Sequence, residues 1–247
     1  MKELTACIAA LLCWACILPA ALGQGGLEKD IIPTSAGAVE ITFIGHGSLM
    51  LRFNNRIIHV DPYAKVADYR ELPRADLILL THHHQDHLDE SALALVRDDK
   101  TELLLTGLCA RQVTGGTVMA NGDNRKVLGI GVEAVPAYNI VHRRDSGELF
   151  HPKGEGNGYV LTFGDTRIYI AGDTENTPEM KALKKIDYAF LPMNLPYTMT
   201  PEMVADAALT FRPRVLYPYH YGETDTAQLV ELLNEAGDIE VRIRRMP

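Results

Sequence analysis

Short runs in which apolar and polar residues alternate predict a series of half-buried β-strands. They occupy residues 39–44, 48–53, 56–60, 159–163, 167–170 and 239–243. Asn54-Asn55 and Gly164-Asp165 separate neighbouring runs, as the turn residues of β-hairpins do. Residues 77–80 are continuously apolar, which is typical of a strand covered on both faces. Two more strands are predicted at residues 188–191 and 215–217.

The starts of four helices are marked by residues that cap helix N-termini. These residues are Asp89, Thr177, Thr200 and either Thr224 or Asp225. Both threonines at 177 and 200 stand before a proline and a glutamate, the usual composition of a first helical turn. The first helix is expected over residues 90–97 and the last one up to about residue 235. Strands followed by alternating strands and helices predict a layered α/β fold with mixed sheets.

The N-terminus has a different pattern from the rest of the chain. Lys2-Glu3 precedes an apolar run over residues 4–22, which ends in Ala21-Leu22-Gly23. This order is typical of a secretory signal peptide, so we predict cleavage after about residue 23 and a periplasmic or secreted protein. The alternative is an uncleaved membrane anchor, because the run approaches the roughly 20 residues that span a bilayer. Residues 24–38 form a polar lead-in, and residues 39–247 are expected to form one domain.

The charge and the cysteine content argue against two features, namely nucleic-acid binding and an intramolecular disulfide in the mature chain. The formal net charge is −8, and no basic run alternates with aromatic residues, so we do not expect nucleic-acid binding. Of the four cysteines, Cys7, Cys13 and Cys16 lie in the leader, and the mature chain keeps only Cys109. An intramolecular disulfide is therefore excluded after cleavage, and the apolar neighbours of Cys109 predict a buried, inert thiol. The sequence does not indicate an oligomeric state.

The strongest chemical signal directly follows the strand predicted at residues 77–80. There the chain reads His82-x-His84-x-Asp86-His87. In an extended segment residues i and i+2 point the same way, so His82 and His84 are placed to bind one metal ion. Asp86 and His87 then turn toward a second ion. Imidazole and carboxylate groups suit zinc, manganese or iron.

Two other strands end in a residue type that binds metals. Asp173 follows the strand at 167–170, and His220 follows the strand at 215–217. Open α/β sheets bind ligands at the ends of their strands. The convergence of three such strand ends therefore predicts one metal centre.

This order of motifs resembles the metallo-β-lactamase superfamily over residues 39–222. Gly45-His46-Gly47 and Val60-Asp61-Pro62 resemble, in particular, the branch that contains ascorbate-6-phosphate lactonase and N-acylphosphatidylethanolamine phospholipase D. The resemblance implies a four-layer αββα sandwich of two mixed β-sheets. It also implies two divalent ions, with zinc expected. Metal one would be bound by His82 and His84, metal two by Asp86, His87 and His220, and Asp173 would bridge them.

The sequence departs from the family pattern at one ligand of metal one. The family has a histidine at the position that aligns with Asn139. An amide oxygen is a weaker ligand than imidazole, and His142 and His151 lie in the following segment. All three residues are candidates for the third ligand of metal one.

Four other residues are candidates for supporting roles near the metals. Asp61, at a strand end, is expected to hold a ligand histidine or a loop in place. His46 is expected at the rim of the site, and Asn157 where glycines let the chain pass close to it. Tyr197 is a candidate substrate contact.

The function implied is metal-assisted hydrolysis of a small molecule. A water or hydroxide shared by the two ions would attack the substrate, because coordination lowers the pKa of water toward ~7. Asp86 or Asp173 would orient this nucleophile and accept a proton. Ester, lactone, phosphodiester and amide bonds fit this chemistry. A β-lactam fits less well, since family members with that activity usually carry Cys or Ser where this chain has Asp173.

Two other functions are compatible with the same residues. Iron-dependent redox enzymes share the fold, but their first motif is similar to His-x-Glu-x-Asp, whereas this chain has His84 at the middle position. A non-catalytic metal- or ligand-binding protein is the other alternative. The metal content distinguishes them, because zinc favours the hydrolase and iron the redox enzyme.

Overall fold

The computed structural model describes residues 26–247, and two seven-stranded β-sheets form its centre. The first sheet contains, in spatial order, β1 (Glu28–Ile32), β2 (Val39–Gly45), β3 (Ser48–Phe53), β4 (Arg56–Val60), β5 (Leu77–Leu79), β6 (Glu102–Leu105) and β7 (Thr117–Val118). The second contains β14 (Glu240–Val241), β13 (Val215–Tyr219), β12 (Tyr188–Pro192), β11 (Thr166–Ile170), β10 (Gly156–Phe163), β9 (Ile130–Ala137) and β8 (Asn124–Val127). The predicted signal peptide and its cleavage site lie outside the described residues.

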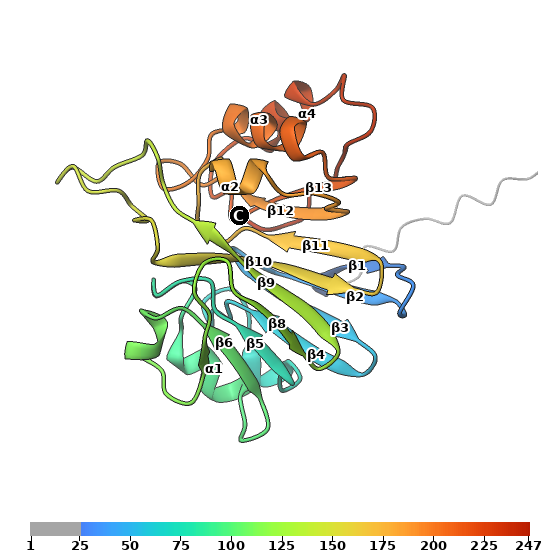
Figure 1. The fold of residues 1–247 in the computed structure, drawn as a ribbon, viewed down its shortest axis with the longest axis vertical. Coiled ribbons are helices and arrows are strands. Elements are labelled where there is room, and N and C mark those ends of the chain that lie inside the picture. Colours follow the sequence, from blue (N-terminus) through green and yellow to red (C-terminus); the bar gives the residue numbers. More distant parts are fainter. Residues whose placement is uncertain (1–25) are drawn as a thin grey trace, which may run out of the picture.

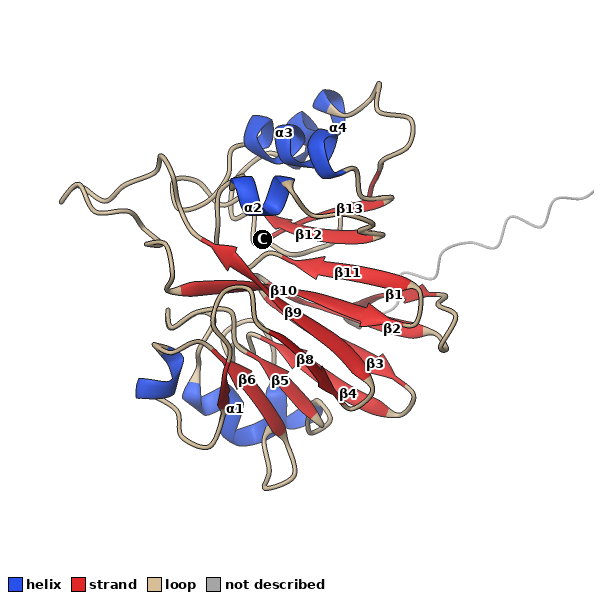
Figure 2. Ribbon diagram, viewed as in Figure 1, coloured by secondary structure: helices blue, strands red, loops and turns tan. Residues whose placement is uncertain are grey.

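Helices cover the two outer faces of the paired sheets. Helix α1 (Glu90–Val96) lies against the first sheet, together with the short 3-10 helices η1 (Tyr69–Glu71) and η2 (Cys109–Arg111). Helices α2 (Pro178–Lys181), α3 (Pro201–Phe211) and α4 (Thr226–Leu232) lie against the second sheet. Figure 1 shows these two groups of helices on opposite sides of the molecule, and Figure 2 shows the strands between them. The predicted four-layer αββα sandwich is confirmed.

Strand alternation explains the three apolar clusters that hold these layers together. Successive side chains of a strand point to opposite faces of its sheet. Leu77 and Leu79 of β5 therefore pack in the central core between the sheets, whereas Ile78 packs toward helix α1. In β11, Ile170 belongs to the central core and Tyr169 to the cluster beneath α2 and α3. Both sheets are mixed, because β4 to β7 and β11 to β14 pair in parallel and the other neighbours pair antiparallel.

The local turn and cap signals act as the sequence predicts. Asn54 and Asn55 both have positive φ values, 46° and 63°, as the two central residues of a type I′ hairpin turn require. The N-caps of α1, α2, α3 and α4 are Asp89, Thr177, Thr200 and Asp225, and each side chain accepts hydrogen bonds from first-turn N–H groups. Helix α4 ends at Leu232, earlier than predicted. Strand β14 covers only two residues of the run predicted at 239–243.

The polar lead-in contributes a strand that the sequence pattern did not predict. Strand β1 pairs antiparallel with β2 over its whole length. Its Asp30 carboxylate accepts hydrogen bonds from the Tyr217 hydroxyl and from the Arg244 guanidinium at 2.5–3.2 Å. Residues near both ends of the described chain are thereby joined, so the lead-in from residue 28 is part of the folded domain.

Two further findings concern single segments. Cys109 is fully buried, and burial raises the pKa of its thiol to about 11, as expected for an inert cysteine. Among the helices of residues 26–247, none is both long and apolar enough to cross a bilayer.

Candidate metal centre

The motif segment after β5 is held in place by Asp61, which follows β4. This buried carboxylate accepts hydrogen bonds from the Thr81 backbone N–H at 2.8 Å and from the Thr81 hydroxyl at 2.5 Å. It also lies 2.8 Å from Nδ1 of His87. A carboxylate at Nδ1 fixes the ring and leaves Nε2 available as a ligand atom. Asp61 therefore orients both the segment and one of its histidines.

The other two strand ends meet at one edge of the second sheet. Strands β11 and β13 both pair in parallel with β12, so Asp173 and His220 emerge on the same side. Gly172, just before Asp173, has φ +66°, and a Cβ there would lie 2.9 Å from the Asn157 carbonyl and 3.0 Å from Thr81. The missing side chain lets β11 approach the motif segment closely.

Seven ligand-type side chains converge into two groups that share Asp173. The ligand atoms of His82, His84 and His151 lie within 4.8 Å of one another, and so do those of His46, Asp86, His87 and His220. Asp173 Oδ2 lies 3.3 Å from His151 Nε2, 3.5 Å from His220 Nε2 and 4.0 Å from His82 Nε2. Asp173 Oδ1 lies 3.4 Å from His87 Nε2. The Asp173 carboxylate therefore stands between the groups.

These spacings fit a pair of coordinated ions. Four ligands at about 2.1 Å from a tetrahedral zinc ion are about 3.4 Å apart. Several of the atoms concerned lack hydrogen-bond partners although they are buried, namely His87 Nε2, His220 Nε2 and Asp173 Oδ1. An unpaired buried polar atom costs free energy, and a cation between such atoms removes that cost. The residues present thus fit bound metal.

The electrostatics of the centre also favour a bound cation. Burial lowers the pKa of His82 far below its usual value, and burial with neighbouring His151 lowers that of His84 to about 4. Both rings are therefore neutral at pH 7 and offer a lone pair. Burial alone would raise the pKa of Asp173, but its interactions with His220, His87 and His151 outweigh burial and lower this pKa strongly. At His87 burial opposes protonation, yet Asp173 and Asp61 raise its pKa to about 10, so the surrounding carboxylates stabilise a positive charge at this position, from a proton or from a metal ion.

Comparison with known proteins assigns the family. The beta-lactamase superfamily domain matches residues 40–220. The chain belongs to the metallo-β-lactamase superfamily. Within this superfamily it is 32% identical, over 74% of its length and 86% of the relative, to a UPF0173 metal-dependent hydrolase from Enterococcus faecalis.

Solved structures agree with this assignment. A Parabacteroides distasonis protein, provisionally assigned as a metal-dependent hydrolase, is 47% identical with a TM-score of 0.86 over 90% of this chain and 100% of that one. Igni18, a metallo hydrolase from Ignicoccus hospitalis, has a TM-score of 0.70 over 85% of this chain and 96% of its own. At 23% identity, Igni18 shows the fold alone.

The departure of this chain from the superfamily pattern has a structural explanation at Asn139. Its amide N–H groups donate to Glu175 Oε1 and to the Tyr197 carbonyl. Its Oδ1 accepts the His151 backbone N–H at 2.9 Å and lies 2.6 Å from His151 Nδ1. Of the three candidates, only His151 lies in the cluster with His82 and His84. Asn139 thus orients His151 by hydrogen bonding and does not itself belong to a ligand group.

His142, the remaining candidate, is directed elsewhere. Its Nδ1 lies 2.8 Å from Glu175 Oε1, and it belongs to neither ligand group. Glu175 is a residue that the sequence analysis did not single out. It is fully buried and accepts hydrogen bonds from the backbone N–H groups of Ile140, Val141 and His142 at 2.6–2.7 Å. The feature of the sequence that could have indicated Glu175 as a site residue is its position two residues after Asp173.

The residues expected around the site lie at different depths. His46 Nε2 is 3.0 Å from Asp86 Oδ2, and the centre of its ring lies 3.6 Å from that of His220, so the expected rim residue is a member of the second group. The Asn157 side chain instead donates to the Met119 carbonyl, while its backbone N–H donates to the Thr81 carbonyl. Tyr197 is 45% exposed and lies above the centre in an open cleft.

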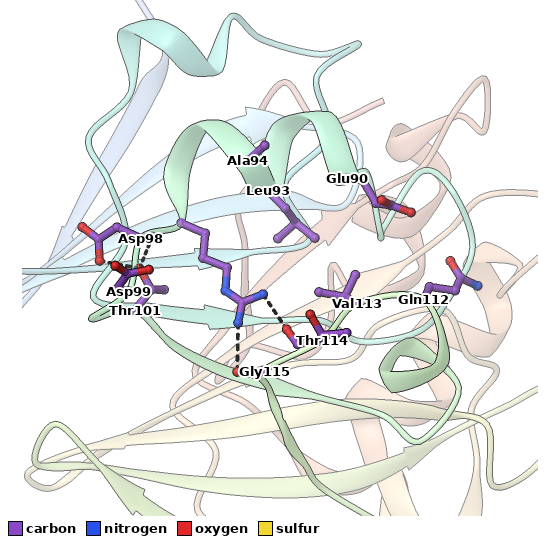
Figure 3. A pocket seen from close by; sticks show the side chains of 11 residues that line it. Glu90, Leu93, Ala94, Asp98, Asp99, Thr101, Gln112, Val113, Thr114 and Gly115 are labelled. Atoms are coloured by element: carbon purple, nitrogen blue, oxygen red, sulfur yellow. Dashed lines mark hydrogen bonds between the residues drawn. The ribbon is translucent and has the colours of Figure 1, made fainter.

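That cleft has a volume of about 470 Å³ and opens directly onto both ligand groups. Its walls comprise His46, His84, Gln85, Asp86, Arg144, Phe150, His151, Asp173, Asn194, Tyr197 and His220. A larger hollow of about 650 Å³ lies at α1, between Glu90, Leu93 and Val113 (Figure 3). Arg97 there donates to the Thr114 and Gly115 carbonyls, and none of the residues of the two ligand groups lines this hollow. The cleft is therefore the candidate substrate site.

Proposed function

We propose that this protein is a hydrolase with two divalent metal ions, natively zinc, that cleaves an ester, lactone, phosphodiester or amide bond of a small molecule. The main support is that two ligand groups converge on Asp173 and that several of their buried ligand atoms have no hydrogen-bond partner. Gly45-His46-Gly47 and Val60-Asp61-Pro62 support a place near the branch of ascorbate-6-phosphate lactonase and N-acylphosphatidylethanolamine phospholipase D.

The proposed ligand sets follow the two groups, except that His46 is assigned as the hydrogen-bond partner of Asp86 and not as a ligand. His82, His84 and His151 would hold metal one, whereas Asp86, His87 and His220 would hold metal two, with Asp173 shared. Nitrogen and carboxylate ligands of this kind suit zinc. When bound, the ions supply Lewis acidity and lower the pKa of water toward ~7.

The protein's own groups would position the substrate and move the proton. Burial would raise the pKa of Asp86, but the hydrogen bond from His46 and the charge of His87 outweigh it, so this pKa lies below the usual value. Asp86 is consequently ionised at neutral pH, and its side chain is 35% exposed toward the cleft. We assign its carboxylate as the group that orients the attacking water and accepts its proton. Asp173 is almost completely buried, and its carboxylate keeps the two ligand groups together.

Metal analysis of the purified protein combined with a substrate screen tests this proposal. We expect two zinc ions per chain and turnover of at least one ester, lactone, phosphodiester or amide, lost on chelation and restored by zinc. Iron in place of zinc, with oxygen consumption and no hydrolysis, would instead favour the redox alternative. Stable metal binding without turnover of any tested substrate would favour a binding protein.

We further propose that the chain is exported and that its leader is removed near Gly23. The support is the apolar run over residues 4–22 with small residues at its end. N-terminal sequencing of the exported protein is expected to begin close to Gln24. An intact Met1 or Lys2 in a membrane fraction would show that the leader is kept as an anchor.

A further inference from the structure

The loop between β9 and β10 forms a hairpin beside the candidate substrate cleft. It spans residues 138–155 and extends away from the sheets at the left of Figure 1. Arg143 and Leu149 form a β-bridge within it, and the Arg144 N–H donates to the Glu148 carbonyl at 2.8 Å. The Gly147 N–H donates back to the Arg144 carbonyl at 2.8 Å. The tip of the loop therefore has a defined backbone around Arg144.

The base of this loop is fixed to the strand end that carries Asp173. Glu175 receives hydrogen bonds from three successive backbone N–H groups at residues 140–142 and from the Asn139 amide. The Glu175 side chain is fully buried, so its carboxylate is held by these four hydrogen bonds and not by water. Charge-assisted hydrogen bonds are stronger than neutral ones. The loop is accordingly set at a fixed position relative to the ligand groups.

Within the loop, Arg144 packs on the aromatic wall of the cleft. Its guanidinium carbon lies 5.1 Å from the centre of the Phe150 ring, and Nη2 donates to the Phe150 carbonyl at 3.3 Å. Phe150 in turn packs edge-on against Tyr197, with ring centres 5.0 Å apart. These three residues line the same cleft as Asp86 and His220. The guanidinium is therefore held beside the candidate metal centre by stacking.

Arg144 is also the one lysine or arginine among the residues that line this cleft. It forms no ion pair with any carboxylate in residues 26–247, although many other arginines of that range do. A guanidinium has five N–H donors in a planar fork that matches carboxylate and phosphate groups. A stacked arginine with unused donors, facing a cleft, is suited to bind an anionic ligand.

We propose that Arg144 binds an anionic group of the substrate, a carboxylate or a phosphate remote from the bond that is cleaved. This inference rests on the proposed function and adds a substrate class to it, namely small organic anions. Phe150 covers one face of the guanidinium and limits water access there, which strengthens the ion pair. Neutral substrates of the same shape are bound less tightly because they leave Arg144 without a partner.

The test compares two esters of equal length with the zinc-loaded protein. One is the 4-nitrophenyl monoester of glutaric acid, which carries a free carboxylate, and the other is neutral 4-nitrophenyl pentanoate. In the wild type we expect a lower KM for the anionic ester. Arg144→Gln should raise that KM roughly ten- to hundredfold, the range for one hydrogen-bonded charge pair, and change the KM of the neutral ester and both kcat values much less. A phosphonate analogue of the glutarate ester tells whether phosphate or carboxylate is preferred.

Arg143→Gln is the matched control, because this neighbouring arginine donates to the Gly147 carbonyl and does not line the cleft. It should leave both KM values unchanged, and Arg144→Lys should restore part of the preference. Equal KM values for the two esters in the wild type, or equal changes for both in Arg144→Gln, would overturn the inference.

Titration calorimetry with glutarate measures anion binding independently of turnover. If neither ester is cleaved but glutarate binding still depends on Arg144, the proposed function fails and the anion site stands; if that binding does not depend on Arg144, the anion site fails as well.

Discussion

Replacing His84 by alanine is expected to lower the rate of hydrolysis about a thousandfold or more, because one ion loses a ligand and with it several kcal/mol of transition-state stabilisation. His84 lies in the first ligand group and lines the cleft, but it belongs to a loop at a strand end rather than to the apolar core. The fold should therefore survive, with an unchanged circular dichroism spectrum. The measurement is kcat/KM at known metal content.

His83→Ala is the matched control for this prediction. His83 is the immediate neighbour in the same segment, but it belongs to neither ligand group. We expect its variant to keep two ions per chain and most of the activity. Wild-type activity in His84→Ala at equal metal content, or an equal loss in both variants, would contradict the assignment of His84.

The second large effect is expected at Asn139. Asn139→Ala removes the acceptor that lies 2.6 Å from His151 Nδ1, so the His151 ring loses its orientation. Loss of such a supporting contact typically costs about 10–100-fold in metal affinity or activity. Competition with a chromophoric chelator should show that one of the two ions is released at lower chelator concentration than in the wild type, and the other at the wild-type concentration.

Two further variants make this result specific. Asn157→Ala removes an equally buried asparagine, whose side chain donates to the Met119 carbonyl and does not contact His151. The affinity for both ions should therefore stay close to the wild-type value. The family has a histidine at this position, so Asn139→His would tighten metal one if residue 139 were itself a ligand. Because the structure places His151 in that group, we now expect Asn139→His to weaken it. Tighter binding in Asn139→His would show that residue 139 itself reaches the metal.

Local patterns were enough to predict the strands and caps on which the centre is built. Alternation with a period of two identifies strands such as β2, β3 and β10 because it reflects which face of a sheet is buried. The N-cap threonines at 177 and 200 act on their own first turns, so no distant residue is needed to recognise them. The i, i+2 spacing of His82 and His84 is likewise local, because side chains two residues apart in an extended segment point the same way. Strand β1 was missed because its burial pattern is set by pairing with β2, not by alternation.

The sequence by itself determined the six ligand candidates at three strand ends, because each strand end is recognised within a short segment. The family and the four layers were implied by the resemblance that these motifs carry. Only the tertiary structure decided which histidine accompanies His82 and His84. His151 reaches the cluster because two distant residues fix the loop between β9 and β10. Asn139 lies 12 residues before His151 and contacts its ring, and Glu175 lies more than 30 residues after the backbone groups at 140–142 that it binds. Contacts of this kind depend on how distant segments pack, which leaves no periodic trace in the sequence.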